Sequence, residues 1–213
     1  SSVPFKDGVN FIEGPSNTGK SYVIGCIDFM FAGKEVPFSK DDTGYDTVML
    51  EMESDDGYSF KAERKIEDGS SGDKGSNVVK VYSDFPGVDK DEYKVGNGEY
   101  STLLLSLIGI DKVPKIIATQ APTDEEMTIR TIFHFFFLSE ENIFEKRTPL
   151  DNPDHSKITK SLTSLIYLLT ADDLNRFLPK ISVEELEKRA TRKAGVISYL
   201  NQKIADLSKQ KEQ

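Results

Sequence analysis

The stretch EGPSNTGKSYVIGCIDFMF, from Glu13 to Phe31, decides how the first part of the chain folds. Within it, GPSNTGKS at 14–21 fits the phosphate-loop pattern G-x-x-x-x-G-K-[ST]. The preceding GVNFIEG is expected to form a short buried strand over Val9–Ile12, and the following residues an apolar helix that ends near Gly33. A strand, a glycine-bearing turn and a helix in this order predict backbone N–H groups that cradle a phosphate.

Each part of the loop has a chemical role in this interpretation. The Lys20 ammonium is expected on the β- and γ-phosphate oxygens, and the Ser21 hydroxyl is expected to coordinate Mg²⁺. Asn17 occupies a position where many such loops have glycine, and Asn tolerates a positive φ better than most residues. The predicted nucleotide-binding residues are consecutive: Gly14, Pro15, Ser16, Asn17, Thr18, Gly19, Lys20, Ser21 and Tyr22.

The bulk composition is that of a globular protein and limits the possible partners. Among 213 residues, 27 are Lys or Arg and 36 are Asp or Glu, so the net charge of −9 gives no global attraction to nucleic acid. The single Cys26 cannot form an internal disulfide, and no apolar stretch approaches the ~20 residues that span a membrane. We expect a cytoplasmic protein. The sequence starts almost at the first strand and stops inside a charged helical pattern, so we also expect a piece of a longer chain.

A period of two begins at Tyr45 and predicts an antiparallel β lobe at about 45–97. In its first hairpin, the inward positions after the Asp56-Gly57 turn include Arg64. The polar run at 67–77 is expected to be a loop that precedes a further strand. YDTVMLEME resembles a Walker B strand that would end in Glu51, but alternating strands carry a solvated face, and Glu51 is assigned to it.

The second half of the chain is expected to contain helices, a return strand and an arm. YSTLLLSLIGI at 100–110 predicts a compact helix, and RTIFHFFFLSEENIF at 130–144 predicts a buried aromatic strand. A capping box at Ser182 opens a helix with an a/d register over four heptads. This pattern favours a coiled-coil arm at 182–213 after a head lobe at 1–181; the alternative is an amphipathic helix on a globular core. The apolar or seam positions are Val183, Leu186, Ala190, Lys193, Ile197, Leu200, Ile204, Leu207 and Lys211.

The order of these elements resembles the N-terminal half-head of an SMC/RecN-like ATPase of the ATP-binding-cassette (ABC) class. GVNFIEGPSNTGKS is similar to the start of that family, YSFKAERKIEDG to its hairpin, and LSLIGI to the helix before its return strand. The GPSNTGKS loop is also similar to those of the SMC-like ATPase subunits of bacterial anti-phage systems. The resemblance implies an α/β fold, namely an ABC-type phosphate-loop half-head with a mixed sheet and an antiparallel β lobe, followed by a coiled-coil helix.

The resemblance also implies cofactors and partners. ATP and Mg²⁺ would bind at the loop, and Glu140 would stand where the family has its Q-loop Gln, as a catalytic residue and metal ligand. The C-terminal half of the same head would bring the Walker B and signature motifs, so this segment would bind ATP without turnover. Two such heads would form a homodimer that acts on DNA. The DNA would lie beside Arg192, Lys193 and Lys203, and effector subunits are further possible partners. The resemblance implies no membrane.

Two other functions remain open from the residues alone. The first is a self-contained phosphate-loop kinase or NTPase, which would need its catalytic carboxylate within the chain, at Glu51 or Glu140. The second is a coiled-coil scaffold module that a bound nucleotide only stabilises. The antiparallel hairpin and the heptads argue against the first, and the intact Gly19-Lys20-Ser21 sequence argues against the second.

Overall fold

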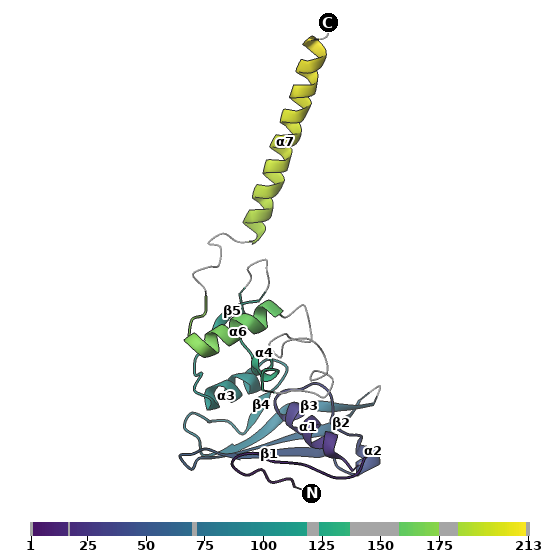
Figure 1. Ribbon diagram of the computed structural model, residues 1–213, viewed down its shortest axis with the longest axis vertical. Helices are drawn as coiled ribbons and strands as arrows, with labels where there is room; N and C mark the ends of the chain where they lie inside the picture. The colour runs from purple at the N-terminus through teal and green to yellow at the C-terminus, as the bar shows by residue number, and fades with distance from the viewer. Residues whose placement is uncertain are drawn as a thin grey trace. The chain divides into compact units, whose positions relative to one another are not determined.

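The computed structural model divides the chain into two compact units, Ser1–Asp173 and Leu174–Gln213 (Figure 1). Each is described by itself. The structure describes residues 2–16, 18–69, 72–118, 124–136, 158–174 and 183–211.

The first unit combines a sheet with helices, and the second contains one long helix. The described elements, in chain order, are α1 (Lys20–Met30), α2 (Lys40–Thr43), β1 (Thr47–Glu53), β2 (Ser59–Gly69), β3 (Gly72–Ser83), β4 (Glu92–Lys94), α3 (Glu99–Leu107), β5 (Lys115–Ile117), β6 (Asp124–Glu126), α4 (Ile129–Phe133), α6 (Ile158–Thr170) and α7 (Val183–Lys211).

The main sheet has the order β1-β2-β3-β4, and all its described pairs are antiparallel. The register places Leu50 opposite Ala62, and Ala62 opposite Val81. Between Arg64 and Ile66 the pairing of β2 with β3 shifts, because β3 carries extra residues there. The antiparallel lobe predicted from the period of two is therefore confirmed, and the inward positions of the first hairpin are buried as expected.

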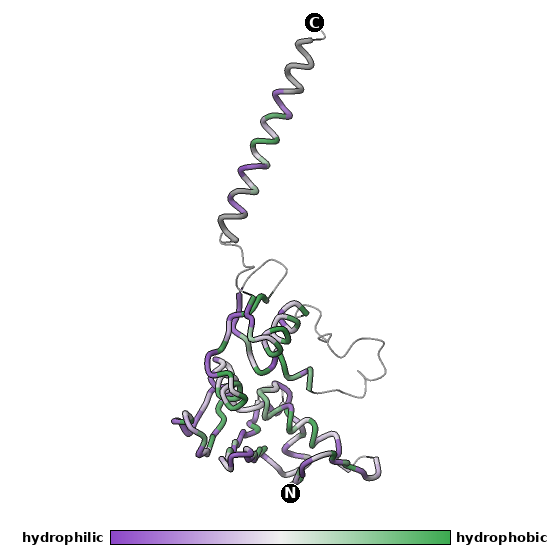
Figure 2. Tube along the Cα trace, turned by 60° about the vertical axis from the view of Figure 1, so that its left-hand side comes forward, coloured by the Kyte–Doolittle hydropathy of each residue, from purple (hydrophilic) through white to green (hydrophobic). Residues whose placement is uncertain are grey.

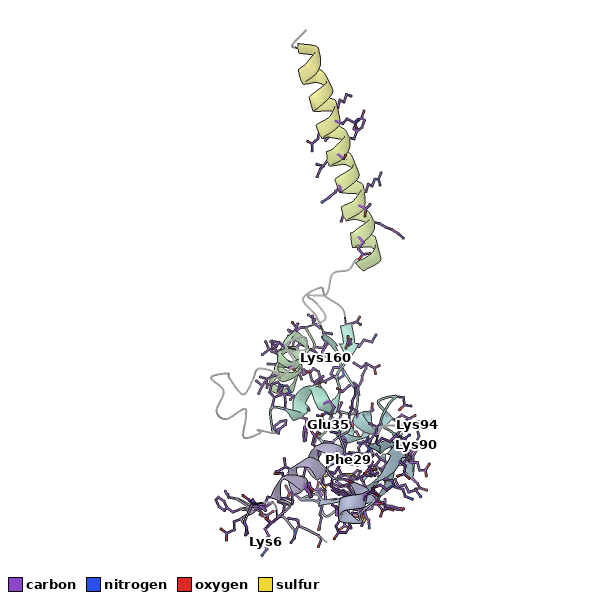
Figure 3. The ribbon with its side chains drawn as sticks, turned by 90° about the vertical axis from the view of Figure 1, so that its right-hand side faces the viewer. Lys6, Phe29, Glu35, Lys90, Lys94 and Lys160 are labelled. Carbon is purple, nitrogen blue, oxygen red and sulfur yellow. The ribbon has the colours of Figure 1, made fainter. Side chains whose placement is uncertain are left out.

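One hydrophobic core joins this sheet to α1, α3 and α4. In Figure 3 the Phe29 side chain lies inside the unit, whereas Lys90 and Lys94 lie at the edge near β4. Figure 2 shows hydrophobic stretches distributed along the chain trace of the first unit. The side chains in this core that are almost fully buried include Phe29, Met30, Phe60, Ala62, Val79, Val81, Tyr100, Leu105, Ile116, Met127 and Ile132.

The polar run at 67–77 was expected to be a loop, and this expectation is wrong. β2 continues to Gly69 and β3 begins at Gly72, with Glu67 paired with Lys74. Backbone hydrogen bonds hold such a ladder regardless of side-chain polarity. Contacts with α2 add to it, because Lys40 Nζ lies 2.7 Å from Asp68 Oδ1 and the Lys40 amide donates to Asp73 Oδ2 at 2.8 Å.

The aromatic run from Arg130 was expected to start a strand, but it starts in a helix. Ile129–Phe133 forms α4, whose first turn is closed by a reciprocal capping box between Thr128 and Thr131. The hydrogen bonds of this box favour helix over strand at the point where the chain enters the aromatic run. The remainder of the predicted return strand, residues 137–144, lies outside the described residues.

The strand expected at Val9–Ile12 is also absent from the structure. These residues have no regular structure, and 81% of Val9 and 89% of Phe11 are exposed. The Asn10 side chain instead forms a local turn, accepting from the Lys6 amide at 2.9 Å and donating to the Lys6 carbonyl at 2.7 Å. A strand forms only when a neighbouring strand pairs with it, and none of the described strands does so here.

The second unit contains α7, which confirms the helix expected after residue 182. Hydrophobic and hydrophilic residues alternate along it (Figure 2). The predicted capping residue Ser182 lies outside the described residues. Within the described ranges, no helix combines the length and apolar character needed to cross a bilayer.

Candidate functional site

The phosphate-loop sequence folds into a tight turn directly before α1. Gly19 has φ 84°, a conformation that favours glycine, and α1 begins at the next residue, Lys20. The Lys20 ammonium reaches back over the loop and donates to the carbonyls of Gly14 at 2.8 Å and Pro15 at 2.5 Å. Thr18 Oγ1 also donates to the Pro15 carbonyl, at 2.8 Å. The carbonyl groups at the start of the loop therefore hold the Lys20 ammonium within the loop.

The same turn presents an open helix N-terminus to solvent. The first turn of α1 contains no acidic residue, and among the described residues no side chain caps its N-terminus. Its free N–H groups and the helix dipole therefore favour an anion in front of the helix. Most of the predicted site residues are exposed there, namely Gly14, Pro15, Ser16, Thr18, Ser21 and Tyr22; Asn17 lies outside the described residues.

The start of the loop is closely packed at Gly14. A Cβ added at Gly14 would lie 3.1 Å from Thr18 Oγ1, the atom that holds the Pro15 carbonyl. A larger residue would require Thr18 to shift by a few tenths of an ångström. Gly19 therefore stands where the backbone conformation favours glycine, and Gly14 stands where a side chain would be crowded.

The donor set at the loop fits Mg²⁺ that is held mainly by phosphate oxygens. The exposed Ser21 hydroxyl directly follows Lys20 and is a hard oxygen ligand. The described residues hold no group of three or more His, Cys, Asp or Glu side chains arranged for a metal. Mg²⁺ commonly takes one or two protein oxygens together with nucleotide phosphates and water. The other predicted ligand, Glu140, lies outside the described residues.

The opposite end of α1 is fixed by Arg64, which sequence reasoning placed only on the inward face of the hairpin. The side chain is 4% exposed and comes from β2. Its Nη1 donates to the Phe29 carbonyl at 2.7 Å and to the Gly33 carbonyl at 2.8 Å, and its Nε donates to the Ser76 carbonyl at 2.9 Å. A cation that binds the last carbonyls of a helix satisfies both their hydrogen bonding and the helix dipole.

Aromatic packing and burial also hold Arg64 in place at the end of α1. The Arg64 guanidinium lies 4.0 Å from the centre of the Phe29 ring. Ser76 sits where the pairing of β2 with β3 shifts, so its carbonyl is available to Arg64. Burial lowers the pKa of Arg64 from its ordinary value, and the nearby Tyr100 acts in the opposite direction. Burial raises the pKa of the Tyr100 hydroxyl, because it disfavours the charged form of each group.

A second contact joins α1 to α4. Asp28 Oδ1 accepts a hydrogen bond from Arg130 Nη1 at 2.7 Å, and the guanidinium lies 5.1 Å from the Phe133 ring centre. These partners are 102 residues apart, so no local sequence signal connects them. Together with Arg64, this ion pair fixes how the helix behind the loop is oriented within the first unit.

Glu51, the alternative carboxylate, lies on the exposed face of β1. Its side chain forms an ion pair with Lys61 on the neighbouring strand, at 3.4 Å. The hydrogen bond to Glu51 is the main cause of a raised pKa for Lys61. Glu51 thus has the environment of a solvated cross-strand pair, as its place in the alternating pattern indicated.

A family model described as an AAA domain matches residues 1–213, the full length of the chain. The chain belongs to the AAA domain family. Membership of this family suggests an ATPase of the SMC-like class. A search of the curated proteins and a search of the solved structures each found no match.

Membership of the AAA domain family gives the loop a general function. The family suggests nucleotide hydrolysis, and it implies binding of a nucleotide, usually with Mg²⁺. In this AAA domain, the open N-terminus of α1 and the Lys20 ammonium are the features that suit a polyphosphate. The mixed α/β architecture with its antiparallel sheet is consistent with an AAA-type domain.

Proposed function

We propose that this chain is the ATP-binding half of an SMC-like ATPase head, followed by the start of a coiled-coil arm. The observation that carries this proposal is the uncapped, exposed N-terminus of α1 beneath a loop closed by Lys20. The family match over the whole chain supports the same class of ATPase. ATP hydrolysis would then occur in the completed head.

The chemistry divides between residues of this chain and residues of a partner. Phosphoryl transfer requires compensation of the phosphate charge and a water molecule held in line. Here the loop amides and Lys20 would hold the β- and γ-phosphates, and Ser21 would hold Mg²⁺. When bound, Mg²⁺ neutralises charge on the phosphate oxygens. The carboxylate that orients the water would come from the C-terminal half of the same head, with Glu140 near the metal.

The exposed start of the chain supports completion by another segment. Val9 and Phe11 are large apolar side chains that lie almost entirely in water, although their sequence is that of a buried strand. Burying them would remove apolar surface from water at about 25 cal/mol per Å². A strand from the C-terminal half of the head could pair with Val9–Ile12 and bury these side chains. Together these strands would form part of the mixed sheet that the resemblance implies.

The arm and its action on DNA form the last part of the proposal. On α7 the seam residues Ile197 and Leu200 are exposed, as they would be before a second helix packs on them. Arg192, Lys193 and Lys203 are exposed on the same helix and offer contacts to phosphates. ATP-driven engagement of two heads would close around DNA, in chromosome organisation, repair or anti-phage defence, with effector subunits in the last case.

The test is Mg²⁺-dependent ATP binding and hydrolysis by this chain, with Lys20→Ala as the matched variant. The variant removes a charged donor worth about 1.5–3 kcal/mol, which corresponds to a rise in Kd of roughly 10- to 150-fold. We expect binding by the wild type and no turnover above the level of the variant. Turnover by the chain alone that disappears in Lys20→Ala would contradict the half-head and would favour a self-contained NTPase.

A further inference from the structure

Three aromatic rings from separate parts of the chain form a row beside the phosphate loop. The Tyr22 and Phe38 rings have centroids 6.0 Å apart at an interplanar angle of 62°, and the Phe38 and Tyr45 rings have centroids 6.1 Å apart at 68°. We call Tyr22, Phe38 and Tyr45 the aromatic row. Its two ends face solvent, since 45% of Tyr22 and 50% of Tyr45 are exposed.

The row begins at the loop itself. Tyr22 lies two residues after Lys20, and side chains in a helix lean toward its N-terminus. The Tyr22 ring therefore reaches back over the turn, where its Cδ2 atom would lie 3.5 Å from a Cβ placed on Gly19. Gly19 is the residue that turns the loop into α1, so the ring stands next to the predicted position of the phosphates.

Close backbone packing holds the second ring in place. A Cβ added at Gly25 would lie 3.1 Å from Pro37 Cβ, so the missing side chain of Gly25 lets the Pro37 segment approach α1 closely. This contact places Phe38 against Tyr22, and Phe38 is itself packed on the hydrophobic core. The middle ring is thus anchored, while the two tyrosines keep open ring surface.

We propose that the aromatic row is the surface on which the base of a bound purine nucleotide stacks. The proposal rests on the proposed function, because the loop must first hold the polyphosphate. The ribose and the α-phosphate would then carry the base away from the loop to one side, and the Tyr22 ring borders the loop at Gly19. The rings of the row are inclined at 62° and 68° to one another, so the base would stack on the open face of Tyr22, and Phe38, which Tyr45 contacts in turn, would brace that ring through edge-to-face contact.

The phosphate loop alone recognises no base, because its amides and its lysine contact only phosphate oxygens. Stacking on the aromatic row would add affinity that depends on the base and not on the phosphates. Base–aromatic stacking contributes about 1–3 kcal/mol per base, or roughly a 5- to 150-fold change in Kd. Pyrimidine nucleotides, with a smaller π face, would bind less tightly than purine nucleotides at the same loop.

The experiment compares two ligands on the same variants, with Mg²⁺ present. Calorimetric titration would measure the Kd of ATP, which has a base, and of inorganic tripolyphosphate, which has none. We expect Tyr22→Leu to raise the Kd of ATP at least about 5-fold, Tyr45→Leu to raise it less because Tyr45 acts only through Phe38, and both variants to leave the Kd of tripolyphosphate unchanged. Tyr22→Phe keeps the ring and should retain the affinity of the wild type. The matched control is Tyr82→Leu, at a tyrosine on β3 with 51% exposure.

The outcomes separate this inference from the proposed function. If the wild type binds both ligands and the two leucine variants bind ATP normally, stacking is refuted while the phosphate loop retains its function. If Tyr22→Leu weakens both ligands equally, Tyr22 braces the loop and the proposal fails. If the wild type binds neither ligand, the proposed function fails first and this inference fails with it. Far-ultraviolet circular dichroism of each variant confirms that a change in Kd does not arise from unfolding.

Discussion

Removing the Arg64 side chain should cost the first unit a large part of its stability. Arg64→Met keeps an apolar stem of similar length but removes three hydrogen bonds, to the carbonyls of Phe29, Gly33 and Ser76. Hydrogen bonds from a charged group contribute about 1.5–3 kcal/mol each, so the upper limit is about 4.5–9 kcal/mol.

The net loss should be smaller than that limit. The variant no longer places a guanidinium in a desolvated site, and methionine retains contact with the Phe29 ring. We therefore expect the free energy of unfolding to fall by about 3–5 kcal/mol, because three carbonyls lose a donor while the cost of burying the guanidinium disappears. Arg64→Lys retains the charge but loses the planar fork and should lie between the two.

Urea denaturation followed by circular dichroism measures this change, provided that the slope against urea stays constant. The matched control is Arg130→Met, which removes a half-exposed arginine with one ion pair, 2.7 Å from Asp28. Such a pair contributes about 0–1 kcal/mol. If Arg64→Met loses no more than Arg130→Met, the carbonyl anchor does not hold α1, and the reasoning is refuted.

Three further substitutions test the packing. The Tyr100 hydroxyl is buried and has no hydrogen-bond partner among the described residues, so Tyr100→Phe should leave stability unchanged or raise it by about 1 kcal/mol at pH 7. Because the folded state raises the pKa of Tyr100, the wild type should lose stability as pH rises above about 10, and urea denaturation should show a smaller loss in Tyr100→Phe. Gly75→Ala places a Cβ 2.5 Å from Phe29 Cε2 and 2.9 Å from Arg64 Nη2, so the same assay should show a loss of about 1–3 kcal/mol; an unchanged midpoint would contradict it. Gly195→Ala meets nothing within 4 Å in α7 and should stabilise that helix by about 1 kcal/mol, seen as increased helicity on thermal melting.

The sequence predicted the first hairpin well because alternation and burial are local there. Val48, Phe60 and Ile66 occupy the buried face that the period of two assigns to them. The role of Arg64 was not predictable in this way. Its carbonyl partners on Phe29 and Gly33 lie 35 and 31 residues away, and only tertiary packing brings them together.

Two of the three wrong predictions, at 67–77 and at Arg130, have different causes. At 67–77 the polar composition predicts a loop, but an antiparallel ladder needs only backbone pairing, and the hairpin extends beyond the core. At Arg130 the aromatic residues suggested a strand, although Thr128 and Thr131 carry the spacing of a helix start. The second signal was present in the sequence, whereas the first depends on contacts such as that between Lys40 and Asp68.

The candidate site was predicted in part. The loop motif located residues 14–22, and the structure adds the hydrogen bonds of Lys20 within it. Phe38 and Tyr45 were not foreseen, because they lie 16 and 23 residues after Tyr22 and no spacing rule connects them. The close contact between Gly25 and Pro37, which brings Phe38 to α1, depends on tertiary packing and cannot be recognised from the sequence.

The anchoring of α1 at one end has a consequence for its motion. Phe29 and Met30 are almost fully buried, whereas Tyr22 and Ile24 are each 45% exposed. Arg64 therefore fixes the C-terminal end of α1 to the sheet, whereas the loop end of the helix is more exposed to solvent. Amide protons along α1 should exchange with solvent in a gradient, fastest near the loop and slowest near Met30. If a bound nucleotide displaced the loop, α1 would rotate about the end that Arg64 holds. The β lobe would therefore be the part of the domain whose structure responds to nucleotide binding.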